Sequence, residues 1–574
     1  MVFLWGLPEI LVRLAAPPLD SYRAILFGDD PRSPLLFVND PYLYWKLRPR
    51  VDIEFLGGRV RTNSEGMRGD EVRRGVAHFL CLGDSTPFGW RVAEEESFPA
   101  RLEEHLGGRG NALPWHGLNA GVPGYSSHQV RVQATSLIER FHPQVVIVCI
   151  GNNESWPVRC SDAELEERRR LRATIESIVG HSHFLLWLKE QVRPQHPQPF
   201  TALTLENAVP RVEQQAFMEN LKGLVRTARQ HGAQVILLAP PAYLQHPPVR
   251  TALFGEWDEW ARRIEQVANL ASEGDLLSFL NEIEEHLQSH AASFFPLWLK
   301  GTALTRLGRV AEGKEALEQA FERQPFLERS KRSYRDAVLS VALEEEVLFR
   351  DINDLFVAAV QGGVPDSLYL DWCHPSAEGH RRIAEALVAW VGCCADQRSY
   401  RAHVHDSLGL ALANKGRWEE ALAHHREALR ARGDDPRIVT NDAVSLLALG
   451  EASEAVARLA DLVKREPGAR DARLLLAWVL STHEEASLRN GVEAMRLLET
   501  AEAGREDSSL LRVRAAVLAE VGRSSEAVAV ARAAASQARA SGWPHLAARI
   551  EAEEQSYCQG VPWRTSAMNY RYVR

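Results

Sequence analysis

Before residue 400, short apolar runs alternate with stretches of helical periodicity. Val76–Leu82 and Gln144–Ile150 are mostly β-branched or apolar, as expected for buried strands of a parallel sheet. Residues 234–239 form a third such run, and apolar positions recur at helical spacing over residues 94–106. Strands that alternate with helices predict an α/β domain built on a parallel sheet.

The pattern changes after residue 400, where the chain is rich in Ala, Leu, Arg and Glu and is helical throughout in its periodicity. Small residues recur at the spacing of a repeated two-helix unit: Gly409, Gly416, Ala421 and Ala428, then Gly450 and Ala455, Gly491 and Ala494, and Gly522 and Ala527. Small residues let two helices approach closely. The segment resembles a four-repeat tetratricopeptide (TPR) array, although its signature aromatic positions are largely lost. An ordinary helical bundle is the alternative.

One further unit of this kind precedes the array. Trp298, Gly301, Gly308, Ala320 and Pro325 fit a single repeat. Two-helix units of this size cannot bury their own apolar faces, so they stack into a superhelix with a concave surface. We therefore predict an inserted helical unit within the α/β domain, in addition to the array that follows it.

Two predicted strands end in polar residues that could carry chemistry. Ser85 follows the first strand in Gly-Asp-Ser, and Asn153 follows the second in Gly-Asn-Asn-Glu. Open α/β sheets bind their ligands at the carboxyl edge, where both side chains would lie. Gly124, in the turn Pro123-Gly124, is a third candidate. Each of these pieces is also compatible with an ordinary turn, because Gly, Asn, Asp and Ser are common turn formers.

The last candidate element is Asp371-Trp372-Cys373-His374-Pro375. A carboxylate three residues before a histidine can reach its Nδ1 across a turn and leave Nε2 free to face a serine, and Pro375 then begins a helix. A solvated Asp–His pair is the alternative. Together, Ser85, His374 and Asp371 have the types of an acyl-transfer nucleophile, base and orienting acid, while Gly124 and Asn153 could stabilise an oxyanion.

These blocks, in this order, resemble the SGNH hydrolases, also called the GDSL esterase/lipase family. The resemblance implies Ser85 as nucleophile, His374 with Asp371 as base and orienting acid, and Gly124 N–H with the Asn153 amide as oxyanion donors. It also implies a three-layer α/β/α sandwich that acts on esters, thioesters or acyl transfer without a metal. Glu154 departs from the usual Asp, and residues 61–69 resemble a stretch that precedes the nucleophile strand in bacterial members.

Composition narrows the class of protein. A chain of 574 residues is too long for a single core, and a net charge of −9 with dispersed His and Arg indicates no nucleic-acid surface. Seven cysteines lack Cys-x-x-Cys or zinc spacing, so we expect buried free thiols in a reducing compartment. No signal peptide or membrane span is evident, so we expect a cytoplasmic location. Val2–Ala16 holds Glu9 and Arg13, so it is too short and too charged to span a membrane, and we expect an amphipathic helix there.

The predicted organisation has six parts: an N-terminal lead-in lobe (1–75), the first hydrolase part (76–257), a TPR-like insertion (258–346), the second hydrolase part (347–398), a TPR array (399–555) and a tail (556–574). We predict a serine esterase that acts through an acyl-serine intermediate on a small acyl ester or an acylated saccharide or lipid, with no cofactor and a protein partner bound by the repeats. Two alternatives stay open: an acyltransferase with a saccharide or lipid acceptor, and a TPR scaffold with an inactive hydrolase fold.

Overall fold

The computed structural model describes residues 33–40, 42–107, 115–158, 160–167, 208–248, 257–290, 293–324, 329–360, 366–393, 396–499 and 507–565. The helix predicted at Val2–Ala16, the repeat residue Pro325 and the end of the predicted tail lie outside the described residues. The chain divides into two compact units: Met1–Val341 with Tyr369–Glu385, and Ala342–Leu368 with Ala386–Arg574. The division into these six predicted parts stays a prediction.

A parallel sheet forms the centre of the first unit. Its strands lie in the order β6 (Trp115–Gly121), β5 (Ala77–Gly83), β7 (Val145–Cys149) and β10 (Gln234–Ala239). The register pairs Leu80 with Val146, and Ile147 with Ile236. Every residue of β7 is buried, as expected for a strand covered on both faces.

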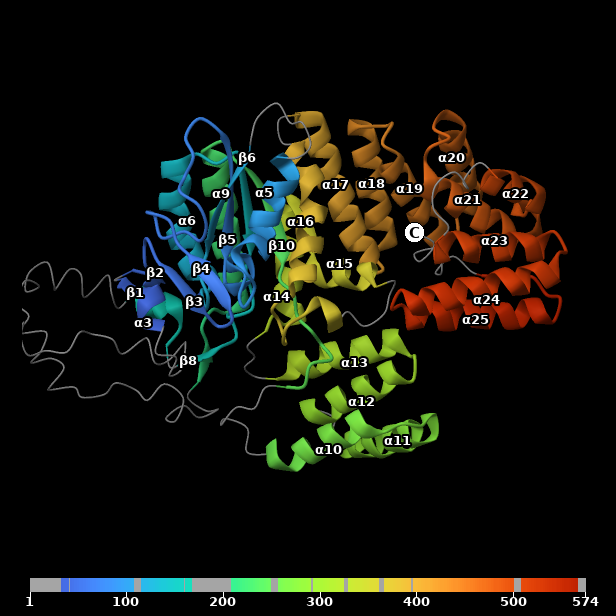
Figure 1. Ribbon diagram of the computed structural model, residues 1–574, viewed down its shortest axis with the longest axis horizontal. Coiled ribbons are helices and arrows are strands. Elements are labelled where there is room, and N and C mark those ends of the chain that lie inside the picture. The colour runs from blue at the N-terminus through green and yellow to red at the C-terminus, as the bar shows by residue number, and fades with distance from the viewer. Residues whose placement is uncertain are drawn as a thin grey trace, which may run out of the picture. The chain divides into compact units, whose positions relative to one another are not determined.

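Helices cover both faces of this sheet. The chain passes from β5 through α5 (Phe98–Gly107) to β6, then through α6 (Ser127–Phe141) to β7, and through α9 (Gln214–Gln230) to β10. Parallel crossovers are right-handed, so this strand order places α5 on one face and α6 with α9 on the other. Figure 1 shows α6 and α9 together on one side of the strands. The predicted three-layer α/β/α arrangement is confirmed.

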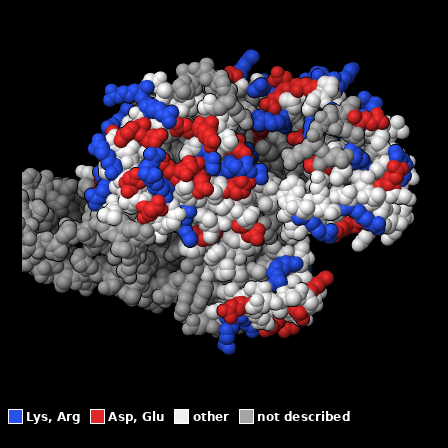
Figure 2. All heavy atoms as spheres, in the orientation of Figure 1, with Lys and Arg blue, Asp and Glu red and all other residues white. Residues whose placement is uncertain are grey.

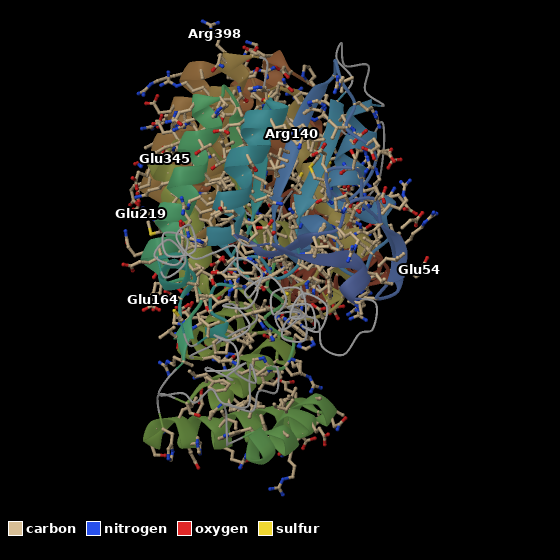
Figure 3. The ribbon with its side chains drawn as sticks, turned by 90° about the vertical axis from the view of Figure 1, so that its left-hand side faces the viewer. Glu54, Arg140, Glu164, Glu219, Glu345 and Arg398 are labelled. Carbon is tan, nitrogen blue, oxygen red and sulfur yellow. The ribbon has the colours of Figure 1, made fainter. Side chains whose placement is uncertain are left out.

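The described part of the lead-in segment forms two small antiparallel hairpins, β1 (Phe37–Asp40) with β2 (Tyr44–Leu47) and β3 (Asp52–Phe55) with β4 (Gly58–Arg61). Period-two alternation is visible in β3, where Phe55 is buried and Glu54 is exposed. In Figure 3, Glu54 on β3 and Glu219 on α9 point outward, away from the packed sides of their elements. The first of these hairpins supplies Trp45, which contacts a loop of the site described below.

A group of helices follows β10: α10 (Trp257–Asn269), α11 (Glu273–Ser289), α12 (Phe294–Arg306), α13 (Val310–Arg323) and α14 (Arg332–Glu344). The pair α12 and α13 packs through glycines, because a Cβ on Gly301 would lie 2.6 Å from Leu317 Cγ and 2.9 Å from Gly313 O. Gly308 lies in the turn between them with φ +78°. Among the described residues that predicted a repeat-like unit, Trp298, Gly301 and Ala320 lie in this close pair of helices and Gly308 lies in the turn that joins them.

The helix α14 also contacts the α/β layer. Tyr334 Oη donates to Val212 O at 2.7 Å, and its ring meets that of Phe217 edge-on at 5.3 Å. Arg335 forms a buried ion pair with Glu318 of α13. The helix α14 therefore packs against both the α/β layer and α13. The apolar periodicity of its sequence does not show which of the two a given residue contacts.

The second unit contains β11 (Leu348–Asp351), α15 (Ile352–Ala359) and successive helices that Figure 1 shows side by side: α17 (Gln397–Asn414), α18 (Trp418–Ala431), α19 (Pro436–Ala448), α20 (Ala452–Arg465), α21 (Arg470–Thr482), α22 (Gly491–Glu499), α23 (Ser508–Glu520), α24 (Ser524–Ala540) and α25 (Pro544–Cys558). Gly416, Gly450 and Gly522 follow helix ends with φ of +75°, +84° and +81°. Ala421, Ala455 and Ala527 are fully buried. The predicted all-helical repeat region is confirmed.

Other expectations can be compared with the described residues. Cys81 and Cys149 are buried free thiols, as expected. None of the described helices is long and apolar enough to cross a membrane. On the face shown in Figure 2, acidic and basic side chains are interspersed. A mixed surface of this kind agrees with the mild net charge and forms no single-sign field over that face.

Candidate active site

Ser85 is the first residue of the short helix α4 (Ser85–Phe88), directly after β5. Asp84 caps this helix, because its Oδ1 accepts a hydrogen bond from Thr86 N at 2.8 Å. Gly83 has φ +147°, and a Cβ there would lie 1.9 Å from Cys149 O on the neighbouring strand. Glycine is therefore required at this strand end, and the sharp turn that it allows places Ser85 at the carboxyl edge of the sheet.

The sequence blocks around Ser85, His374 and Asp371 come together at this edge. His374 Nε2 lies 2.8 Å from Ser85 Oγ, and His374 Nδ1 lies 2.9 and 2.8 Å from the two carboxylate oxygens of Asp371. Asp371 also accepts hydrogen bonds from the backbone N–H groups of Cys373 and His374 at 3.1 and 3.0 Å. The histidine is thus held by the carboxylate on one nitrogen and faces the hydroxyl with the other.

The lowered pKa of Asp371 agrees with its contacts to His374 and to the backbone N–H groups. Burial raises the pKa of Asp371, but the hydrogen bond and charge of His374 and the two backbone N–H groups outweigh it and lower that pKa to about 2. The carboxylate therefore stays ionised at neutral pH. The ring of Trp90 stacks on that of His374, with centroids 5.8 Å apart and planes at 29°. Sequence reasoning did not identify Trp90, because no pattern around it distinguishes it from a core aromatic residue.

Gly124 and Asn153 belong to the two other strand-end loops. Gly124 has φ +79°, so this turn position favours glycine. Asn153 is buried and its Nδ2 donates to Tyr125 O at 2.9 Å. The structure therefore connects the Gly124 loop directly to the Asn153 loop. The oxyanion role of both residues stays a prediction.

The neighbours of Asn153 have structural contacts of their own. Asn152 Oδ1 accepts a hydrogen bond from Ser330 N at 3.0 Å. Glu154 is fully buried and accepts from Ser127 N at 2.9 Å, at the start of α6. Burial raises the pKa of Glu154 to about 8, although the Ser127 N–H and the charge of Arg211 act in the opposite direction. Glu154 thus connects its loop to the start of α6.

The side chains around His374 include types that can also bind a metal ion. In the part of the chain that the structure describes, one cluster of potential ligands occurs, formed by Asp371, Cys373 and His374, with ligand atoms within 4.8 Å of one another. Both imidazole nitrogens of His374 already have close partners, Ser85 Oγ and the Asp371 carboxylate. A metal on this histidine would have to replace one of these contacts, so the donor set fits a proton-transfer site better than a metal centre.

Two buried residues outside the predicted blocks contact the Gly124 loop. Trp45 Nε1 donates to Pro123 O at 3.1 Å, and Arg211 Nη1 donates to Gly124 O at 2.7 Å. Arg211 also bonds Gln129 and Asp162 at 2.5 and 3.1 Å. No local sequence signal marks either residue, because each reaches a loop that is distant along the chain.

Comparisons with known proteins agree with this architecture. Residues 81–301 match the model of the GDSL-like Lipase/Acylhydrolase family, and residues 412–479 match that of the tetratricopeptide repeat. No curated protein matches the chain.

The solved structures that match part of this chain have low sequence identity and low TM-scores. A putative lipolytic protein of the G-D-S-L family from Desulfitobacterium hafniense is 14% identical, with 54% of this chain and 98% of that chain covered and a TM-score of 0.26. A catalytic mutant of the acetylxylan esterase Axe2 from Geobacillus stearothermophilus is 16% identical, with 55% and 94% covered and a TM-score of 0.27. Such values support no conclusion about the substrate. By the two family models alone, the chain carries a GDSL-like lipase/acylhydrolase domain in residues 81–301 and a tetratricopeptide repeat domain in residues 412–479.

Proposed function

We propose that this protein is a serine esterase that cleaves an acyl ester through an acyl-serine intermediate. The observation that carries the proposal is the continuous chain of contacts from Ser85 Oγ to His374 Nε2 and from His374 Nδ1 to Asp371, at 2.8 Å in each step. In this mechanism His374 accepts the proton of Ser85 as the hydroxyl attacks the acyl carbonyl. Asp371 orients the ring and stabilises the imidazolium that forms.

The remaining steps use the strand-end loops. The tetrahedral oxyanion is stabilised by the N–H groups of Ser85 and Gly124 and by Asn153 Nδ2. His374 then donates its proton to the departing alkoxide oxygen, which leaves the acyl group on Ser85. Water, activated by His374, attacks the acyl-enzyme and regenerates the free serine. The repeats would bind a protein partner on the concave surface that such arrays form.

An acyltransferase is the second candidate, because an alcohol of a saccharide or lipid could replace water at the acyl-enzyme. The esterase proposal is tested with activated acyl esters of graded chain length, from acetyl upward, against the wild-type protein and Ser85→Ala. We expect turnover and labelling by a fluorophosphonate probe for the wild-type protein alone. Product analysis with an acceptor alcohol present distinguishes transfer from hydrolysis. Labelling that persists in Ser85→Ala would remove Ser85 from the mechanism.

A further inference from the structure

Three consecutive carbonyl groups of the Gly124 loop are each held by a different side chain. Trp45 Nε1 donates to Pro123 O at 3.1 Å, Arg211 Nη1 donates to Gly124 O at 2.7 Å, and Asn153 Nδ2 donates to Tyr125 O at 2.9 Å. The three donors come from β2, from the segment after β9 (Val209–Pro210) and from the loop after β7. They lie far apart in the sequence and converge on three successive peptide groups.

The first of these contacts has a direct geometric consequence. A peptide group is planar and trans, so its C=O and its N–H point in opposite directions. The carbonyl of Pro123 and the N–H of Gly124 belong to the same peptide group. A hydrogen bond that fixes Pro123 O therefore also fixes the direction of the Gly124 N–H, the group that the proposed mechanism uses for the oxyanion.

We propose that Trp45 and Arg211 are positioning residues that hold the Gly124 peptide in the orientation needed to stabilise the oxyanion. This inference rests on the proposed function, and it adds to that function two residues outside the hydrolase sequence blocks. Both act through the backbone of Gly124 and touch no reacting atom.

The surroundings of Trp45 make its contact rigid. Its side chain is buried, its ring meets the Tyr125 ring edge-on at 5.6 Å, and Tyr125 Oη donates to Trp45 O at 2.7 Å. Trp45 and Tyr125 thus fix each other through packing and hydrogen bonding. In a buried site, water cannot readily replace a lost donor, so removal of the indole N–H leaves Pro123 O without its partner.

Arg211 holds the next peptide group. Its guanidinium bonds Gly124 O, Gln129 and Asp162, and it lies 5.8 Å from the Trp45 and Trp156 ring centroids. A planar guanidinium can serve these acceptors together, whereas the single ammonium of a lysine cannot present the same fork of donors. The two peptide groups that flank the Gly124 α-carbon are thus both held. Trp45 donates to Pro123 O of the first, and Arg211 donates to Gly124 O of the second.

The test compares Trp45→Phe with Trp298→Phe in the full-length protein. Trp298 is a matched control, because it is also buried and donates through Nε1 to a backbone carbonyl, that of Leu244 at 3.2 Å. Removal of one oxyanion donor typically lowers kcat by about 10²–10³, and a misdirected donor retains part of its effect. We therefore expect Trp45→Phe to lower kcat by about tenfold to a hundredfold with KM unchanged. Trp298→Phe should leave kcat unchanged.

A second measurement separates positioning from a loss of stability. An alkyl boronic acid forms a tetrahedral adduct with a catalytic serine and places an oxygen where the oxyanion develops. Its inhibition constant should rise in Trp45→Phe by the same factor by which kcat/KM falls. Arg211→Lys, which keeps the charge and most of the packing, should change both quantities in the same direction. If Trp45→Phe does not fold, the Arg211→Lys variant provides the test of the proposal.

The possible outcomes are distinct. A wild-type protein that turns over no ester and takes up no phosphonate probe contradicts the proposed esterase function itself. An active wild-type protein whose Trp45→Phe and Arg211→Lys variants keep wild-type kcat and boronate affinity overturns the positioning role alone. The same holds if Trp45→Phe and Trp298→Phe show equal losses of kcat and of thermal stability, because both losses then reflect packing.

Discussion

The loops at the carboxyl edge of the sheet and the helical array use buried residues in different ways. At the sheet edge, buried polar groups make specific hydrogen bonds, as in the contacts of Ser85 with His374 and of Asn152 with Ser330. In the array, small residues such as Ala421 and Ala455 make no polar side-chain contact and allow helices to pack closely. A single atom therefore matters for chemistry in the first region, whereas side-chain volume matters for stability in the second.

The largest expected effect is that of Asp371→Asn. Asp371 accepts the His374 Nδ1–H, and an amide at this position no longer favours the tautomer that leaves Nε2 free to accept the proton of Ser85. In a triad of this type, such a change lowers kcat by about 10⁴. Steady-state kinetics with an activated acetyl ester measure the loss, and circular dichroism checks the fold. Activity near the wild-type level would show that Asp371 does not orient the base.

The next largest effect should distinguish Asn153 from its neighbour Asn152. Asn153→Ala removes a predicted oxyanion donor and should lower kcat by about 10²–10³ with little change in KM. Asn152→Ala leaves Ser330 N–H without its partner and should lower the free energy of unfolding by about 1–3 kcal/mol, with a much smaller change in kcat. Kinetics and thermal unfolding of both variants make the comparison. If the two variants exchanged these effects, the role assigned to Asn153 would belong to Asn152.

A pH effect on stability should follow from Glu154. The pKa of this buried acid is raised to about 8 in the folded protein, so the folded state holds a proton that the unfolded state releases at lower pH. Its contribution to stability is therefore present below the unfolded pKa and is lost as the pH rises toward about 8, by at most about 1.4 kcal/mol per pH unit. Glu154→Gln should remove this part of the slope in unfolding experiments from pH 5 to 9. If the free energy of unfolding depended on pH in the same way in Glu154→Gln and in the wild-type protein, the raised pKa of Glu154 would be contradicted.

The smallest effect tests packing in the array. A Cβ on Gly409 would lie 2.4 Å from His425 Cδ2 and 3.1 Å from Ala421 O, so Gly409→Ala should push α17 and α18 apart. We expect a loss of about 1–3 kcal/mol in the free energy of unfolding, with kcat unchanged. Gly468→Ala is the control, because a Cβ there meets no atom within 4 Å. Equal stability of the two variants would show that the helices accommodate the added methyl group.

The sequence by itself determined the local elements. The apolar runs predicted β5, β7 and β10, the helical periodicity over residues 94–106 predicted α5, and the recurring small residues predicted the repeats. It also identified Ser85, from a strand end followed by a polar turn, and Asp371 with His374, from a carboxylate three residues before a histidine, because both are local patterns. These features depend on neighbours within a few residues, which periodicity and turn chemistry describe well.

Only the tertiary structure decided which distant groups meet. Ser85 and His374 are 289 positions apart, Trp45 and Pro123 are 78 apart, and Arg211 and Gly124 are 87 apart. Such contacts depend on strand order, on the hand of the crossovers and on the path of the lead-in segment, none of which leaves a periodic signal around Trp45 or Arg211. The chemistry-bearing residue types were therefore readable from the chain, whereas the contacts of Trp45 and Arg211 with the Gly124 loop became visible only in three dimensions.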